Sequence, residues 1–337
     1  MKTSDFDYSL PPSAIAQHPL EKREESRLLV LGRTSGNILH RQFRDIVDYL
    51  GEGDVLVRND TKVFPARLHA KKATGAEVEF LLIEELPNGN WSSMVKPGRR
   101  VRVGDVFRTG DLSLRIVNIL PEGFREIEIH SENSLLESLE KVGEIPLPPY
   151  IHEPLAEVAR YQTVFAAASG SVAAPTAGLH FTEELLKKVQ NNGCKIATLT
   201  LHVGPGTFRP VKAEEISEHV MHEEHFELSK TCAEDIQTAK RIVSLGTTSL
   251  RTLEAVAEKN GQVSASKGKT GIFIYPGFEF KVVDALITNF HLPKSTLLML
   301  VSAFSRRDII FRAYEEALKE GYRFFSFGDA MYITDQI

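Results

Sequence analysis

Three residues with chemically useful side chains gather at one strand-to-helix junction in the second half of the chain. Asn289, His291 and Lys294 lie where an apolar strand predicted at 285–290 leads into an apolar helix predicted at 295–304. Histidine titrates near neutral pH, and amide and ammonium groups can hold polar atoms of a substrate. Because α/β enzymes keep their chemistry where strands end, the junction predicts an active site. Alternatively, Asn289 and His291 only satisfy backbone groups in a turn, and Lys294 is solvated.

A second segment, residues 171–182, combines small residues with one histidine, His180. Small residues let a ligand approach the backbone closely, and a histidine adds a group that titrates near neutrality. The alternative is a tight connection that contains a hydrogen-bonded histidine. We expect a wall of the ligand site at Pro175, Thr176, Ala177 and Gly178.

Two more loops leave predicted strands through glycine. After the strand at 242–245, Gly246 precedes three hydroxyl residues at a predicted helix start, Thr247, Thr248 and Ser249. Free amides and hydroxyls at such a position suit a carboxylate or another anion, although helix capping alone explains at least one of the hydroxyls. The loop at 201–210 presents His202, Thr207 and Arg209. It lacks the phosphate-loop pattern, so it is weak evidence for a nucleotide site.

Metal binding is a third possibility, because histidines recur at positions 219, 222 and 225. On a helix His219 and His222 would share a face and His225 would not, and the spacing typical of zinc proteases is absent. We therefore expect no metal, and we interpret His219 and His222 as the polar edge of a cleft. The two cysteines form no CxxC pair, which argues against a disulfide or a thiolate metal site.

Basic side chains are frequent in the first third of the chain. Between residues 54 and 108 there are ten lysines and arginines and seven acidic residues. This modest excess fits either a solvated face or contact with a phosphate backbone. The candidates for phosphate contact are Arg67, Lys96, Arg99 and Arg100, together with Arg160 farther along the chain.

The elements that must position these residues alternate between two patterns. Strands predicted at 27–31 and 55–57 flank a helical stripe at 43–50, whereas period-two alternation at 77–80, 101–103, 112–116 and 125–129 predicts an antiparallel barrel or sandwich. A helix at 134–142 and a proline-rich linker at 146–149 close this region. The remainder predicts strands at 195–201, 242–245, 272–275 and 285–290, and helices at 183–191, 231–240, 250–258, 295–304 and 308–319.

The simplest topology is a layered α/β domain with a small antiparallel β-barrel inserted into it. We place the discontinuous α/β catalytic domain at 1–66 and 150–337, and the barrel at 67–149. The composition, with 42% hydrophobic and 25% charged residues, is that of a soluble globular protein, and the amino terminus lacks an apolar signal core. We expect a cytoplasmic protein. Its net charge of −5 argues against a general basic coat for nucleic acid.

Long motifs in the chain resemble the S-adenosylmethionine:tRNA ribosyltransferase-isomerase family of queuosine biosynthesis. They include residues 160–164, 171–182, 201–204, 206–208, 246–249 and 284–304, and the resemblance extends from 6–8 and 59–61 to 327–329.

The resemblance implies an enzyme that transfers and isomerises the ribosyl moiety of S-adenosylmethionine onto 7-aminomethyl-7-deazaguanine at the tRNA wobble position. The expected products are epoxyqueuosine in the tRNA, adenine and methionine, and no cofactor or metal is implied. The reaction needs a base to take a ribose 5′ proton and an acid for the departing adenine, so His180 and His291 are the first candidates. His202 and His222 are the second candidates for these acid–base roles. The expected partners are S-adenosylmethionine and tRNA, and we expect a monomer.

Two other functions fit parts of the sequence. A non-enzymatic RNA-binding module would use the barrel and would bind RNA without any effect of S-adenosylmethionine. A metal-assisted hydrolase would use His219 and His222 and would lose activity on chelation. Release of adenine from S-adenosylmethionine separates both alternatives from the transferase.

Overall fold

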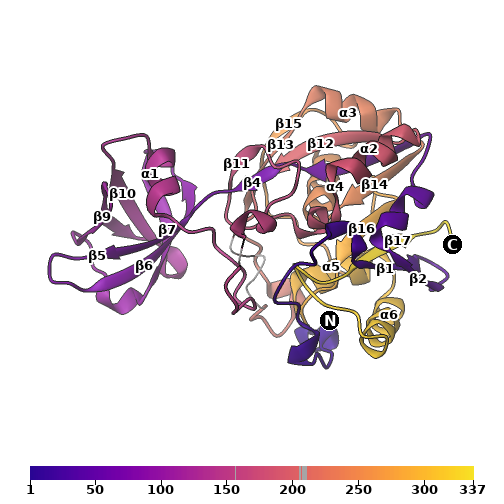
Figure 1. Cartoon of the computed structure of the whole chain (residues 1–337), viewed down its shortest axis with the longest axis horizontal. Coiled ribbons are helices and arrows are strands. Elements are labelled where there is room, and N and C mark those ends of the chain that lie inside the picture. The colour runs from indigo at the N-terminus through magenta and orange to yellow at the C-terminus, as the bar shows by residue number, and fades with distance from the viewer. Residues whose placement is uncertain (156, 205, 207–210) are drawn as a thin grey trace. The chain divides into compact units, whose positions relative to one another are not determined.

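The structure is a computed structural model, and it describes residues 1–155, 157–204, 206 and 211–337. The chain divides into two compact units. One, here the α/β unit, comprises residues 1–61, 149–168 and 174–337; the other, the barrel unit, comprises residues 62–148 and 169–173. Figure 1 shows the elements of both. The mixed fold class expected from the sequence, an α/β layout with a closed antiparallel barrel, is confirmed.

The α/β unit is built on a nine-stranded mixed sheet with the order β15-β13-β12-β3-β14-β16-β17-β1-β2. In chain order the strands are β1 (Arg27–Gly32), β2 (Ile38–Gln42), β3 (Asp54–Asn59), β12 (Lys195–Leu201), β13 (Glu224–Leu228), β14 (Arg241–Leu245), β15 (Ser266–Thr270), β16 (Ala285–Asn289) and β17 (Ala330–Thr334). The central run β12-β3-β14-β16 is parallel, and it is paired, for example, as Val57 with Ala197 and with Ser244. Its near-continuous apolar strands are those of a sheet covered on both faces.

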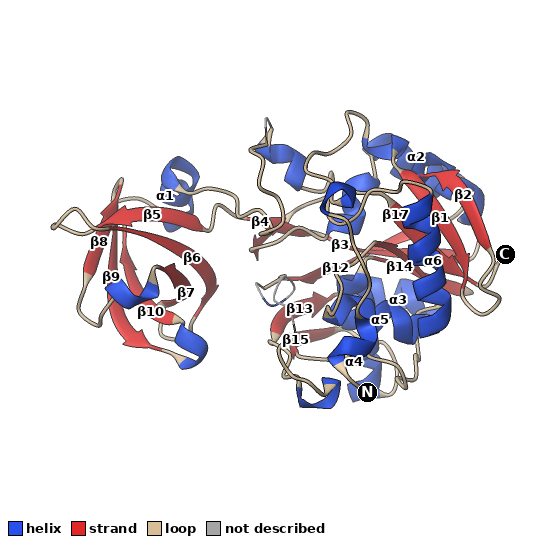
Figure 2. Cartoon of the chain, turned by 90° about the horizontal axis from the view of Figure 1, so that it is seen from below, coloured by secondary structure: helices blue, strands red, loops and turns tan. Residues whose placement is uncertain are grey.

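Helices cover this sheet on both faces (Figure 2). The helices are α2 (Glu183–Asn191), α3 (Lys230–Gln237), α4 (Thr247–Asn260), α5 (Thr296–Phe304) and α6 (Arg307–Lys319). Leu185, Leu186 and Val189 of α2 pack with Phe43 and Ile46 against one face, whereas α3, α4 and α5 lie on the opposite side. The stripe predicted at 43–50 forms the 3-10 helix Phe43–Tyr49.

The barrel unit closes six strands in the order β10-β7-β6-β5-β8-β9. They are β5 (Arg67–Lys71), β6 (Glu77–Glu85), β7 (Trp91–Lys96), β8 (Val106–Thr109), β9 (Leu112–Ile119) and β10 (Arg125–His130), followed by α1 (Leu135–Val142). Alternate residues such as Leu68, Phe80, Phe107 and Leu114 fill the interior. Where the chain passes between the units, β4 (Thr61–Val63) pairs with β11 (Ala168–Ser171).

Two predicted strands are wrong. Residues 101–103 follow a 3-10 helix and turn instead, because the Arg102 amide donates to Asp105 Oδ2 at 2.7 Å and Gly104 has a φ of 89°. Residues 272–275 lie beyond the end of β15, and there the Phe273 ring packs against the rings of His219 and Tyr275 rather than extending the ladder. Alternating apolar residues also suit a loop whose rings pack on a neighbour.

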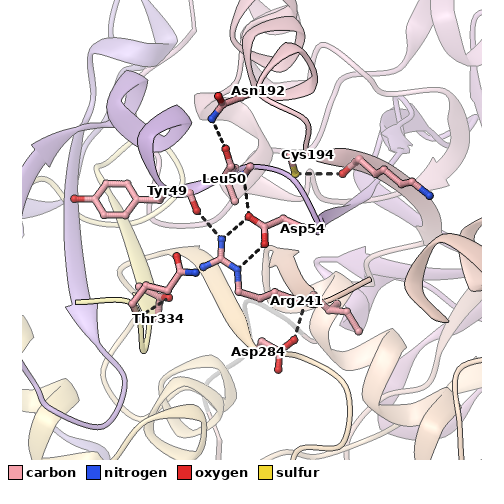
Figure 3. Close-up of polar contacts among 12 residues, drawn as sticks. Tyr49, Leu50, Asp54, Asn192, Cys194, Arg241, Asp284 and Thr334 are labelled. Carbon is pink, nitrogen blue, oxygen red and sulfur yellow. Dashed lines mark hydrogen bonds and ion pairs between the residues drawn. The ribbon is translucent and has the colours of Figure 1, made fainter. Parts of the chain in front are cut away.

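The amino ends of the central parallel strands are fastened by a buried ion pair (Figure 3). Arg241, at the start of β14, donates from Nε to Asp54 Oδ1 at 2.9 Å and from Nη2 to the Tyr49 carbonyl at 2.6 Å. Asp54 at the start of β3 also accepts the Gly51 amide, and Asp284 accepts the amide of Ile242 at 2.7 Å. This network holds the edge of the sheet opposite the carboxyl ends. Among the described residues, no helix is long and apolar enough to cross a membrane.

Candidate active site at the carboxyl edge of the sheet

Polar residues meet at the carboxyl ends of β3, β12, β14 and β16, and those after β12, β14 and β16 belong to loops singled out in the sequence. Asn59 ends β3 and Thr61 comes two residues later, His202 follows β12, Gly246 follows β14, and Asn289 ends β16. Neighbouring parallel strands must end on the same side, so their following residues are brought together whatever their distance in sequence. We call this set of polar residues the carboxyl-edge site.

Asn289 links two of the predicted segments. It accepts a hydrogen bond from Thr176 Oγ1 at 3.1 Å and donates from Nδ2 to His180 Nε2 at 3.0 Å. Both partners belong to the 3-10 helix Thr176–His180, which packs against β16. Thr176, His180 and Asn289 therefore form one hydrogen-bonded cluster, in which His180 and Asn289 are buried and Thr176 is partly buried.

His180 is held on both ring nitrogens. Because Asn289 Nδ2 donates a hydrogen bond to Nε2, the ring hydrogen is assigned to Nδ1, which donates to Ser26 Oγ at 2.8 Å. The ring stacks on Phe43 with centroids 4.9 Å apart. Burial and, to a smaller extent, the positive charges of Arg323 and Arg23 lower the pKa of His180 to about 3. His180 is therefore a neutral histidine at physiological pH.

His291 is also buried and neutral. Its Nε2 lies 2.9 Å from Thr288 Oγ1, and its backbone amide donates a hydrogen bond to the Tyr314 hydroxyl at 2.9 Å. Burial lowers the pKa of His291 to about 3. Lys294, by contrast, is half-exposed and pairs with Asp7 at 2.7 Å. Of the three residues at this junction, Asn289 alone contacts the cluster around His180.

The start of α4 forms the second part of the carboxyl-edge site. Gly246 has a φ of 87°, which L side chains rarely adopt, and it lies against Ala177. Thr248 accepts a hydrogen bond from Asn59 Nδ2 at 3.3 Å. Ser249 is fully buried and donates back to the Leu245 carbonyl, so only Thr247 and Thr248 lie at the end of the helix that faces the site.

Close packing explains why a glycine occupies position 178 in the small-residue wall. A Cβ there would come within 2.7 Å of the Phe165 ring and 2.8 Å of Thr163 Cγ2. Pro175 and Ala177 are buried in the same turn. The prediction that this wall faces a ligand stays a prediction.

His202 is less buried than His180 and His291. Thr61 Oγ1 lies 2.8 Å from its Nδ1, and Thr61 in turn donates its amide to Asn59 Oδ1 at 3.1 Å. Burial and then the nearby His225 lower the pKa of His202. His222 is half-buried against Gly206. Thr207 and Arg209 of the same loop lie outside the described residues.

Sequence reasoning missed Asn59 and Thr61 as parts of this site. Asn59 is buried, accepts the amides of Thr61 and Leu201, and donates to Leu201 and Thr248. A polar pair directly after a buried strand was the available signal. The buried ion pair between Arg251 and Glu224 was also missed; Glu224 accepts the Gly204 amide at 3.0 Å.

The histidines at 219, 222 and 225 are not on a helix. His219 follows the 3-10 helix Ile216–Glu218, His222 lies in a loop, and His225 belongs to β13. Within the described part of the chain, no group of three His, Cys, Asp or Glu residues is arranged to hold a metal ion.

The basic residues predicted to contact tRNA lie in both units. Lys96, Arg99 and Arg100 are exposed at the end of β7 and in the following 3-10 helix of the barrel unit. Arg67 starts β5, and its Nε lies 3.8 Å from Glu79. Arg160 belongs to the α/β unit, where its Nη1 donates to the Glu21 carbonyl at 3.0 Å.

Comparison with known proteins places these residues in context. Residues 3–333 match the family model described as queuosine biosynthesis protein. A crystal structure of the S-adenosylmethionine tRNA ribosyltransferase from Thermotoga maritima is 41% identical, and the alignment covers 98% of this chain and 100% of that chain with a TM-score of 0.56. Nearly the whole chain, both units included, takes part in these matches, and the chain belongs to the queuosine biosynthesis protein family.

Proposed function

We propose that this enzyme transfers and isomerises the ribosyl moiety of S-adenosylmethionine onto 7-aminomethyl-7-deazaguanine at the wobble position of tRNA. The products are epoxyqueuosine in the tRNA, adenine and methionine. The observation that carries the proposal is the meeting of four strand-end loops in the carboxyl-edge site, within a chain matched over residues 3–333 by its family. S-adenosylmethionine is a substrate here, and the protein works as a cytoplasmic monomer without a resident cofactor or metal.

The start of α4 suits the carboxylate of S-adenosylmethionine. The first amides of a helix lack intrahelical partners and attract anions, and Thr247 and Thr248 add hydroxyls at that end. The wall at Pro175, Thr176, Ala177 and Gly178 would face the adenosine. On the barrel unit, Lys96, Arg99 and Arg100 supply exposed charge for the tRNA backbone.

Proton transfer is better assigned to His202 than to the two deeply buried histidines. A general base works best when its pKa lies near the operating pH, and at His180 and His291 the pKa is about 3. Both would act as neutral hydrogen-bonding groups that orient the site. His202 is only partly buried and Thr61 orients it through Nδ1, so His202 would take the ribose 5′ proton and His222 would assist adenine departure.

Adenine release tests the reaction. The purified protein is incubated with S-adenosylmethionine and with tRNA carrying 7-aminomethyl-7-deazaguanine, and adenine is followed by chromatography. We expect adenine only when both substrates are present, and none with tRNA that carries guanine at the wobble position. Adenine formed without tRNA, or tRNA binding without any adenine, would contradict the proposal.

Turnover of two variants tests the histidine assignment. His202→Ala should lower kcat by roughly 10²- to 10⁴-fold, the usual range for a general acid or base. His291→Gln should keep a pH–rate profile of wild-type shape, because a neutral residue contributes no ionisation near neutrality. A profile that loses an ionisation in His291→Gln but keeps it in His202→Ala would reverse the assignment.

A further inference from the structure

Three arginines line a small pocket next to His180. Arg23 lies in the 3-10 helix before β1, Arg160 in the 3-10 helix Val158–Tyr161, and Arg323 after α6. All belong to the α/β unit, and Ser26, His180 and Ser326 complete the polar lining. The pocket opens to solvent, and its volume of about 20 Å³ is enough for about one water molecule. A larger anion would therefore sit with its oxygens in the pocket and the remainder outside.

Backbone carbonyls hold two of these guanidinium groups without neutralising them. Arg23 Nη1 donates to the carbonyls of Gln162 at 2.8 Å and Leu179 at 3.3 Å, and Arg160 donates to those of Glu21 and Leu20. Carbonyls fix the direction of a guanidinium but carry no net charge. The groups are thus placed in advance with most of their positive charge uncompensated.

Among the described residues, one carboxylate reaches this trio. Asp329 Oδ1 lies 3.5 Å from Arg323 Nη2, and the same carboxylate also accepts the backbone amides of Arg27 and Arg323. One negative charge, shared with two amides, therefore faces three positive charges. Such an excess at a partly buried site favours an added anion.

Two further observations indicate that the arginines lack a hydrogen-bond acceptor or counter-charge, and both favour an anion in the pocket. Burial, and then the charge of Arg160, lower the pKa of the Arg23 guanidinium, so these two groups repel each other. The Nε of Arg160 is buried and meets no acceptor in the part of the chain that the structure describes. An oxyanion between the arginines would relieve both.

We propose that this arginine pocket, formed by Arg23, Arg160 and Arg323, binds a phosphodiester of the tRNA substrate. This inference rests on the function proposed above. A phosphodiester presents two non-bridging oxygens that share one negative charge and protrude from the chain, which suits a pocket too small for a nucleoside. The carboxylate of S-adenosylmethionine has another place, at the start of α4, beside the opposite end of the 3-10 helix Thr176–His180.

The pocket would anchor RNA directly beside the carboxyl-edge site. Leu179 and His180 line the pocket, whereas Thr176 and Ala177 of the same short helix contact Asn289 and the Gly246 turn. One phosphate fixed at the first end would limit how the rest of the tRNA can approach the second. Arg23 and Arg323 then belong with Arg160 to the RNA-binding residues.

Filter binding of tRNA to Arg323→Gln tests the pocket. This substitution removes the charge and leaves Asp329 with its two backbone amides, so the local fold should persist. One lost phosphate contact removes about 0.7 to 0.9 from the salt slope and weakens binding about 4- to 5-fold at about 0.15 M salt. Arg323→Lys, which keeps a charge, should lose less. The matched control is Arg306→Gln, an exposed arginine paired with Asp308, and it should bind like wild type.

The probe is tRNA carrying 7-aminomethyl-7-deazaguanine without S-adenosylmethionine, so binding is read independently of turnover. Equal affinity and salt slope in Arg323→Gln and Arg306→Gln would overturn the pocket, and so would a raised KM for S-adenosylmethionine with unchanged tRNA affinity. Weakened binding in Arg323→Gln, together with no adenine release by wild type, would support the pocket and reject the reaction. Wild-type protein that binds no tRNA would overturn both.

Discussion

Two deeply buried histidines should make the stability of the α/β unit depend on pH. In the folded protein the pKa of His180 and of His291 is lowered from 6.5 to about 3, chiefly by burial. Between these values the unfolded chain binds protons that the folded chain does not, so the free energy of unfolding rises with pH. The stability that the protein owes to having both histidines neutral is fully present above about pH 6.5 and is lost as the pH falls toward 3.

The size of the effect follows from the two pKa values. At about pH 5 an unfolded histidine of pKa about 6.5 is protonated with an excess of about 30 to 1, whereas the folded one stays neutral. The difference is about 2 kcal/mol for each histidine relative to about pH 8. His180 and His291 together should therefore cost the folded state about 4 kcal/mol at about pH 5.

Urea unfolding of wild type and His180→Gln at these two pH values measures the effect. Near-ultraviolet circular dichroism follows the tyrosines, several of which lie in the α/β unit around His291, such as Tyr8 and Tyr314. His180→Gln should lose about 2 kcal/mol less than wild type between the two pH values. Any packing cost of the substitution is present at both pH values and cancels.

Two comparisons make the result specific. His152→Gln, at an exposed position, should keep the wild-type pH dependence. The single tryptophan, Trp91, lies in the barrel unit, so its fluorescence follows that unit in the same samples. If wild type and His180→Gln lost the same free energy on acidification, His180 would not be a buried neutral group in solution and our account of it would be wrong.

Further predictions concern the site, the basic turn, the fastening of the sheet and metal independence. Asn289→Ala should destabilise the protein by about 2 kcal/mol, because it leaves Thr176 and His180 without their hydrogen-bond partner, and it should lower kcat. Unchanged urea midpoints and unchanged turnover would contradict the linking role of Asn289. Arg99→Gln combined with Arg100→Gln should reduce the salt slope of tRNA binding by roughly 1.5 to 2 without changing the KM for S-adenosylmethionine, as filter binding and steady-state kinetics would show. Arg241→Met should cost about 3 kcal/mol of stability, because it leaves Asp54 buried without its partner, yet keep kcat within about twofold, since it lies at the opposite edge of the sheet; a large kcat loss in folded protein would refute this separation. Treatment with a chelator should leave adenine release intact, and activity that returned only on adding a metal ion would contradict a metal-free reaction.

The sequence determined the fold class, the α-helices and about half of the strands among the described residues, because local patterns carried the information. Apolar runs predicted β3, β12, β14 and β16, and alternation predicted three of the six barrel strands, β6, β9 and β10. Strands at the margins were less visible: β13 and β15 are antiparallel additions of mixed polarity, such as Ser266–Thr270, that no apolar pattern marks. Residues 272–275 carried the pattern and did not form a strand, since pairing with β13 ends at Thr270.

The grouping of the candidate site was also predictable in part. Thr176, His180 and Asn289 were each placed at a strand end or a small-residue turn, and parallel strands bring such positions to one edge. Sequence patterns place side chains in this way because strand ends and turns are local features.

Only the tertiary structure decided what each of these side chains can do. His180 and Ser26 lie 154 positions apart, and their hydrogen bond, the Phe43 ring and the surrounding burial turn a titratable histidine into a neutral one. His202, with similar local sequence cues, stays partly exposed. A pKa depends on solvent exclusion and on charges brought from distant segments, such as Arg23 and Arg323, and neither is encoded in the spacing of neighbouring residues.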